Sequence, residues 1–113
     1  MAVININTKE KSESLRETNL PILVEYMAPW CVYCRRIGPA YDQLAQQYDG
    51  KVIFAKIDID EEPQLAEQEQ IEVVPTLIIY HKGKALGSIV APESKAKIDA
   101  FIKETWKELE GAE

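Results

Sequence analysis

Hydrophobic positions along the chain follow two alternating spacings, which predicts strands and helices in turn. Residues 20–28 (LPILVEYMA) form an apolar run of strand length opened by a proline, which is typical of a strand covered on both faces. Residues 51–59 (KVIFAKIDI) form a second run, rich in β-formers, that ends at acidic turn residues. Residues 2–8 (AVININT) predict a short edge strand.

Helical spacing governs the segments between these runs. Residues 9–18 predict a polar helix that faces solvent. Residues 60–70 predict a helix with a proline in its first turn and carboxylates at its positive end. From residue 31 to residue 48 the apolar positions recur at helical spacing, and Gly50 then ends the helix. These positions are Ile37, Ala40, Tyr41, Leu44, Ala45 and Tyr48.

The C-terminal third predicts a β-hairpin followed by a helix. Residues 76–90 contain two β-rich runs joined through Lys82–Gly83–Lys84. Residues 93–109 place apolar side chains near one face of a closing helix, namely Ile98, Phe101, Ile102 and Leu109. The predicted order is therefore β-α-β-α-β-α-β-β-α, with parallel βαβ units before an antiparallel hairpin. We expect an α/β fold, a central mixed β-sheet flanked by α-helices, formed by residues 1–113 as a single domain.

The composition fits an ordinary globular domain and disfavours nucleic acid as a partner. The chain has 113 residues, 46% of them hydrophobic and 28% charged, which is enough for one core and too little for two. Its net charge of −6 and pI near 4.9 lack the basic footprint that nucleic-acid binding needs. We interpret the acidic cluster at residues 58–63 (DIDEEP) as a solvated face.

No segment predicts a membrane span or a leader. The longest apolar runs, such as residues 73–80 (VVPTLIIY), are far shorter than the roughly 20 residues that cross a bilayer. Residues 1–11 (MAVININTKEK) contain neither a basic leader nor a sustained apolar stretch. We therefore expect a cytoplasmic protein that binds no membrane.

Both cysteines of the chain lie within residues 29–34 (PWCVYC). A disulfide between Cys31 and Cys34 would close a loop of about four residues, worth roughly 2 kcal/mol against about 3 for a loop of about 15, which makes a poor structural staple. A structural zinc site needs four ligands, whereas the chain offers one cysteine pair and one histidine, His81, which we interpret as a surface residue. We expect no metal within one chain, and a zinc ion or iron–sulfur cluster shared by two chains is kept as an alternative.

The position of the cysteine pair favours redox chemistry. Cys31 falls where a predicted strand ends and a helix begins, and there unpaired backbone N–H groups and the helix dipole stabilise a thiolate. An exposed cysteine in such a place commonly has its pKa lowered from about 8.5 to about 7.5 or below. Cys34 lies one helical turn further on the same face. Cys31 would therefore attack a substrate disulfide, and Cys34 would resolve the mixed disulfide that results.

The sequence resembles the thioredoxin family. The segments that carry the resemblance follow the family's order and spacing: EYMAPWCVYC, Pro39, FAKIDID, VVPT and KGK. The match extends over about residues 20–102. The resemblance implies the thioredoxin fold and dithiol–disulfide exchange on protein substrates. It implies no cofactor beyond a redox-active disulfide between Cys31 and Cys34.

The resemblance also assigns roles to individual positions. Cys31 resembles the family's nucleophile and Cys34 its resolving thiol. Pro75 resembles the family's cis-proline, which faces the cysteines and lets the backbone before it pair with an extended substrate. A proline at the first position of a strand is, independently, where a sheet tolerates a missing N–H. Pro39 also matches the family, and it should kink its helix by removing an internal hydrogen bond.

Two charged residues stand inside apolar strands. Glu25, within ILVEYM, should have a raised pKa if it faces the core, and an ordinary one if it faces solvent on a half-covered strand. The family usually carries an acid here that helps to move the proton of the resolving thiol. Glu25 is thus a candidate general base for Cys34, directly or through water. Lys56 resembles the lysine that partners this acid, unless it simply points outward.

We expect an apolar rim around Cys31 that holds an extended protein substrate. The residues expected to contact substrate are Trp30, Val32, Tyr33, Val74, Pro75 and Ala91, with Val73 and Pro92 beside them.

The chain departs from the family pattern at several positions near the cysteines. Val32 and Tyr33 replace the usual Gly-Pro between the cysteines, and Tyr33 stands where many glutaredoxins have a tyrosine. Met27 replaces a tryptophan that usually packs near the site, and Ala91 replaces a glycine that usually lets substrate approach. These changes bear on which proteins the chain recognises and on the reduction potential of its disulfide.

The leading hypothesis is a cytoplasmic, monomeric protein-disulfide reductase that a separate enzyme, thioredoxin reductase, reduces again. One alternative is a more oxidising or glutathione-linked thiol–disulfide oxidoreductase, suggested by Val32 and Tyr33. Another is a non-catalytic binding module on the same fold. The third is the metal-bridged dimer.

Overall fold

The apolar runs of the sequence form one mixed β-sheet. The computed structural model describes residues 2–111, and within them the sheet has five strands in the order β1-β3-β2-β4-β5. Strands β1, β3 and β2 are parallel, whereas β4 pairs antiparallel with β2 and with β5. The strands are β1 (Ile4–Asn5), β2 (Ile22–Met27), β3 (Ile53–Asp58), β4 (Thr76–His81) and β5 (Lys84–Val90).

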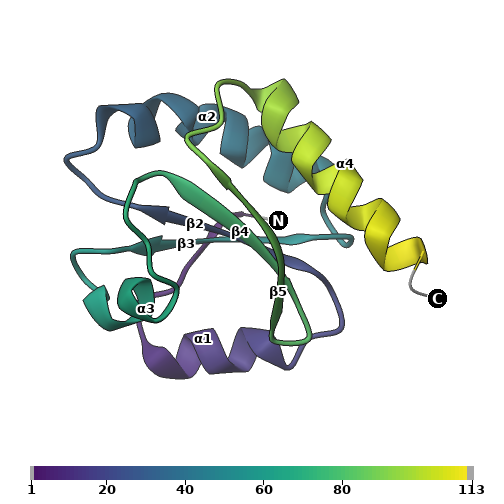
Figure 1. Cartoon of the computed structure of the whole chain (residues 1–113), viewed down its shortest axis with the longest axis horizontal. Helices are drawn as coiled ribbons and strands as arrows, with labels where there is room; N and C mark the ends of the chain where they lie inside the picture. Colours follow the sequence, from purple (N-terminus) through teal and green to yellow (C-terminus); the bar gives the residue numbers. More distant parts are fainter. Residues whose placement is uncertain (1, 112–113) are drawn as a thin grey trace.

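Helices cover both faces of this sheet. Figure 1 shows α2 and α4 on one face and α1 and α3 on the other. The helices are α1 (Lys9–Arg16), α2 (Val32–Gln47), α3 (Pro63–Gln68) and α4 (Lys95–Gly111). The element order confirms the β-α-β-α-β-α-β-β-α order predicted from the sequence, and the mixed sheet confirms the predicted fold class.

Local sequence signals explain several element boundaries. The side chain of Thr8 accepts a hydrogen bond from the N–H of Lys11 and begins α1, which is entirely without buried residues, as predicted. The hairpin turns at Lys82 and Gly83, both with positive φ, so Lys84 already belongs to β5 rather than to the turn.

Some boundaries differ from the sequence prediction. Helix α3 has six residues and begins at its proline, because the acidic residues before it form a turn. Helix α2 ends at Gln47, and Gly50 adopts a left-handed φ of 79° in the turn that follows. Pro39 lies inside α2, and the kink expected there stays a prediction. The side chain of Leu109 lies outside the described residues.

Strand β2 is buried on both faces, as its apolar run predicted. On one side, Leu23 belongs to a core cluster with Phe54, Leu77 and the buried stripes of α2 and α4. On the other, Val24 and Tyr26 join a second cluster that extends to α3. The stripe of α2 consists of Ile37, Tyr41, Leu44 and Ala45, and that of α4 includes Ile98 and Ile102. Because these stripes hold α2 firmly on the sheet, its N-terminus is fixed at the end of β2.

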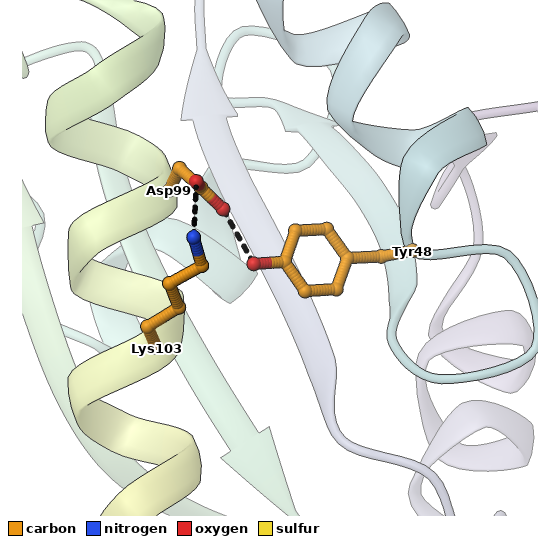
Figure 2. Close-up of polar contacts among 3 residues, drawn as sticks. All are labelled: Tyr48, Asp99 and Lys103. Carbon is orange, nitrogen blue, oxygen red and sulfur yellow. Dashed lines mark hydrogen bonds and ion pairs between the residues drawn. The ribbon is translucent and has the colours of Figure 1, made fainter.

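A polar bridge links the two helices on the first face. Figure 2 shows Asp99 of α4 between Tyr48, just after α2, and Lys103. The Tyr48 hydroxyl donates to Asp99 Oδ1 at 2.5 Å, and Lys103 Nζ lies 3.0 Å from Asp99 Oδ2. The hydrogen bond from Tyr48 lowers the pKa of Asp99, and burial raises the pKa of Tyr48. Within this bridge, the hydrogen bond from Tyr48 is therefore the interaction that contributes most to the packing of α2 against α4.

Replacing Tyr48 with phenylalanine should weaken this docking. Tyr48→Phe keeps the ring and removes one hydrogen bond to a carboxylate, so we expect the free energy of unfolding to fall by about 1–2 kcal/mol. Urea unfolding measures the change. Lys103→Met removes only the exposed ion pair with Asp99 and should cost about 0.5 kcal/mol or less. Equal losses in the two variants would contradict the leading part given to Tyr48.

Candidate functional site

The two cysteines form a disulfide at the N-terminus of α2. The Cα atoms of Cys31 and Cys34 lie 5.3 Å apart across it. Cys31 is the N-cap of the helix, with extended backbone, and the N–H of Cys34 donates to its Sγ at 3.1 Å. This confirms that Cys31 lies at the junction of strand and helix. The N–H group and the helix dipole both favour negative charge on the Cys31 sulfur when the disulfide is open.

The exposure of the nucleophile differs from the sequence prediction. Cys31 was expected to be exposed, but it is only 8% exposed, and Cys34 only 4%. Both belong to a small cluster with Ala28, against which Met27 and Val74 pack. The expectation was wrong for this disulfide form because the segment before Pro75 packs against Cys31. The resemblance placed this segment opposite the cysteines, but the burial that results from the contact was not predicted.

The segment before β4 faces the disulfide. The Val74–Pro75 peptide bond is cis, and the carbonyl oxygen of Val74 lies 3.8 Å from Cys31 Sγ. Pro75 is fully buried, and its own carbonyl accepts a hydrogen bond from the N–H of Ala91 at 2.8 Å. Val74 and Ala91 are half-buried. The structure therefore brings Cys31, Val74, Pro75 and Ala91 together, and the contact of this segment with substrate stays a prediction.

Exposed apolar side chains stand beside the disulfide. Trp30 is 64% exposed, and Val32 and Val73 are exposed as well. The indole Nε1 of Trp30 donates to Asp60 Oδ2 at 3.0 Å, which fixes the edge of the ring while its face stays open to solvent. Of the eight residues of the predicted rim, Trp30, Val32 and Val73 are exposed, Tyr33, Val74 and Ala91 are half-buried, and Pro75 and Pro92 are buried.

Asp60 is a site residue that the sequence interpretation missed. It was read as part of a solvated acidic face, although it holds the ring of Trp30. Its backbone N–H is fixed by Asp58 Oδ1 at 2.8 Å. A usable signal existed: β2 and β3 are parallel neighbours, so residues after their carboxyl ends lie at the same edge of the sheet.

Tyr33 is half-buried and points back into the protein. Its hydroxyl donates to the carbonyl oxygen of Pro92 at 2.8 Å. Ala91, next to Pro92, has a φ of 44°, in the left-handed region that favours glycine. Both residues expected to contact substrate at this edge are therefore engaged in local structure, while Val32 beside them stays open.

Glu25 is buried on the face of β2 that α2 covers. It is 4% exposed, and its Oε2 lacks a hydrogen-bond partner within the described residues. Burial raises its pKa from 4.5 to about 7, opposed by the charge of Lys56 and reinforced by that of Asp42. Lys56 stands beside it in the parallel register of β2 and β3, and is half-buried. The core-facing interpretation of Glu25 is confirmed.

A cavity connects Glu25 with the resolving cysteine. It has a volume of about 140 Å³, and its lining includes Glu25, Lys56 and Cys34. Arg35 and Asp42, which the sequence interpretation did not single out, complete its polar wall. Charged side chains form part of its lining, and the space is large enough for more than one water molecule, so a hydrogen-bonded path from Cys34 to Glu25 fits inside it.

The remaining polar candidates lie elsewhere. His81 ends β4, at the opposite end of that strand from Pro75, and its Nε2 lies 3.1 Å from the carbonyl oxygen of Asn19. Among the described residues, no group of three or more His, Cys, Asp or Glu side chains is arranged to hold a metal ion.

In residues 2–111, no helix is long and apolar enough to cross a membrane.

A model of the thioredoxin family matches residues 2–104 of the chain. Thioredoxin 1 of Nostoc sp. is 32% identical over 102 residues, which cover 90% of this chain and 95% of the relative. Thioredoxin M4, chloroplastic, of Arabidopsis thaliana is 39% identical over 101 residues, covering 89% of this chain and 52% of that protein.

Solved structures agree with these relatives. The thioredoxin of Plasmodium falciparum superimposes with a TM-score of 0.83 at 27% identity, covering 90% of this chain and 98% of that one. The Malassezia sympodialis thioredoxin (Mala s 13) gives a TM-score of 0.83 at 25% identity, covering 92% and 90%. With the disulfide at the helix N-terminus and the Val74–Pro75 segment facing it, these matches show that the chain belongs to the thioredoxin family.

Proposed function

We propose that the protein reduces disulfide bonds of other proteins, with Cys31 as the attacking thiolate and Cys34 as the resolving thiol. Dithiol–disulfide exchange is the chemistry of the thioredoxin family, to which the chain belongs. The observation that carries the assignment of roles is the hydrogen bond from the N–H of Cys34 to Cys31 Sγ at the N-terminus of α2. It favours negative charge on sulfur 31 rather than on sulfur 34.

The reaction proceeds in two exchange steps from the reduced protein. The Cys31 thiolate attacks one sulfur of the substrate disulfide, forms a mixed disulfide and releases the other substrate sulfur as a thiolate. The Cys34 thiolate then attacks Cys31 Sγ, closes the Cys31–Cys34 disulfide and releases the second substrate thiolate. Two electrons pass to the substrate, and its two thiolates take up protons.

Glu25 is the proposed acceptor of the Cys34 proton. Its pKa of about 7 lies near neutral pH, where a general base is most effective. The cavity that it shares with Cys34 gives the proton a path through water. Lys56, in the same cavity, would stabilise the carboxylate before it accepts the proton and limit the rise of its pKa.

An extended protein segment fits the rim better than a small molecule does. Trp30 and Val32 offer exposed apolar surface directly before and after Cys31 in the sequence, and Val73 offers more beside Val74. The backbone at Val74, which faces Cys31 Sγ, offers peptide groups for pairing with such a segment. Pro75 is buried and would set the course of this backbone, while Ala91 would complete the surface.

The proposal also covers the protein's reducing partner, its oligomeric state and its cellular compartment. Members of the family act on disulfide substrates and are reduced by a reductase. We propose thioredoxin reductase as the reducing partner, a monomeric state and a cytoplasmic location, as the sequence analysis expected. The relatives from Arabidopsis thaliana and Spinacia oleracea are chloroplastic proteins, so fractionation of the source cells decides the compartment.

No observation favours the alternatives over this proposal. A reduction potential near about −270 mV, rather than about −200 to −230 mV, would separate the reductase from a glutathione-linked oxidoreductase. A binding module would keep its function after both cysteines are replaced by serine. A metal assay on anaerobically purified protein tests the metal-bridged dimer.

Cysteine variants should separate the two proposed thiol roles. Cys31→Ser should abolish insulin reduction in the presence of dithiothreitol, because no attacking thiolate remains. Cys34→Ser should accumulate a mixed disulfide with the substrate, visible on a non-reducing gel and released by excess dithiothreitol. Insulin reduction that survives in Cys31→Ser would reject the role assigned to that residue.

The burial of Glu25 should make stability depend on pH. Because its pKa rises from 4.5 to about 7 on folding, the folded state binds more protons than the unfolded state between these values. Stability should therefore fall as the pH rises through this window, by about 3 kcal/mol in total. Glu25→Gln should lack that fall, as measured by urea unfolding of the oxidised protein at about pH 4 and about pH 8.5. Glu67→Gln, at an exposed position of α3, is the matched control and should keep it.

The same replacement should slow the second exchange step. Without a proton acceptor for Cys34, release of the mixed disulfide in Glu25→Gln should be about tenfold slower or more, with formation of the mixed disulfide little changed. Rapid-mixing measurements of both steps between about pH 6 and about pH 9 provide the test. A release rate equal to wild type over that range would exclude Glu25 as the base.

A further inference from the structure

Tyr33 joins the helix that carries the cysteines to the loop between β5 and α4. Its hydroxyl, in the first turn of α2, donates to the carbonyl oxygen of Pro92 at 2.8 Å. Its ring packs against both the Leu23 core cluster and the small cluster of the cysteines. The ring and the hydroxyl are thus both held by the protein. The side chain connects the first turn of α2 with residues 91–92, two segments that lie far apart in the sequence.

The loop is in turn tied to the segment that faces the disulfide. The N–H of Ala91 donates to the carbonyl oxygen of Pro75 at 2.8 Å. Two hydrogen bonds therefore connect three segments: the first turn of α2, residues 91–92 and Pro75 at the start of β4. Each of these segments borders Cys31 or the substrate-contacting surface beside it.

The backbone of Ala91 needs such support. Its φ of 44° lies in the left-handed region, where a residue with a Cβ atom is less stable than glycine. Conformations of this kind persist where the surrounding structure holds them. Here one hydrogen bond holds the N–H of Ala91, and the other holds the carbonyl of the next residue, Pro92. Loss of the Tyr33 hydroxyl would release one of these two restraints.

We propose that Tyr33 is a positioning residue. Its hydroxyl holds residues 91–92, and through them the carbonyl of Pro75, in the geometry that receives an extended segment of the protein substrate. The inference rests on the proposed reduction of protein disulfides. It deepens that function by giving the tyrosine between the cysteines a role in protein-substrate binding and none in the sulfur chemistry itself.

Tyr33→Phe tests the inference by removing one oxygen atom and keeping the ring. The KM for insulin should rise about three- to tenfold, the effect of one lost hydrogen bond, while kcat changes less than about twofold. The rate with 5,5′-dithiobis(2-nitrobenzoate), a small disulfide that needs only the sulfurs, should stay at the wild-type value. Amide hydrogen exchange at Ala91 should accelerate about three- to tenfold, because the loop is less firmly held.

Tyr48→Phe is the matched control. It also removes one tyrosine hydroxyl that links the α2 region to another element, but Tyr48 lies at the opposite end of α2 from the cysteines, and its partner is Asp99 of α4. If lower stability alone raised the KM for insulin, both variants would show the rise. Tyr48→Phe should leave the insulin KM and the exchange of the Ala91 amide at wild-type values.

The outcomes separate this inference from the function on which it rests. A wild-type protein that fails to reduce insulin would reject the proposed function. A wild-type protein that reduces insulin, with a Tyr33→Phe variant of equal KM, would overturn only the positioning role. An equal loss of rate with both disulfides, or the same rise of KM in Tyr48→Phe, would overturn it as well.

Discussion

The burial of β2 on both faces governs the geometry of the site. Because helices cover the strand from either side, its register against β3 and β4 is fixed, and the chain leaves the sheet at one defined point. Cys31 lies just beyond that point, as the N-cap of a helix that the same core holds in place. The position of the sulfur relative to the sheet thus follows from hydrophobic packing rather than from any contact of the sulfur itself.

The same burial changes the ionisation of a carboxyl group on β2. Glu25 points toward α2 from the middle of the strand, so its carboxyl group is desolvated without full compensation by hydrogen bonds. Lys56, its neighbour across the sheet, moderates the effect by charge. The outcome is a carboxyl group whose pKa lies near neutral pH and which lines the same cavity as Cys34. Burial of this carboxyl group costs stability when it ionises, and it places next to Cys34 the group that we propose as its base.

Two departures of this chain from the family pattern belong to one structural unit. Tyr33 stands between the cysteines, and Ala91 occupies a position where the family usually has glycine. The structure connects them: the tyrosine hydroxyl binds the residue that follows Ala91, whose backbone is left-handed. Each change alone alters the surface beside the disulfide. Together they place a residue with a strained, left-handed backbone where the family usually has glycine. Hydrogen bonds at the N–H of Ala91 and at the carbonyl of Pro92 hold that backbone.

The sequence by itself determined what depends on neighbouring residues: the order of elements, the two-sided burial of β2, and the place of Cys31 at a helix start with Cys34 one turn on. Only the tertiary structure decided how closely Val74 covers Cys31, the hydrogen bond from Trp30 to Asp60 and that from Tyr33 to Pro92. These pairs are 43, 30 and 59 residues apart. Periodicity reports which side of an element faces the core, since burial acts on each element separately. Which loops meet depends on how all the elements pack at once, and no local spacing encodes that.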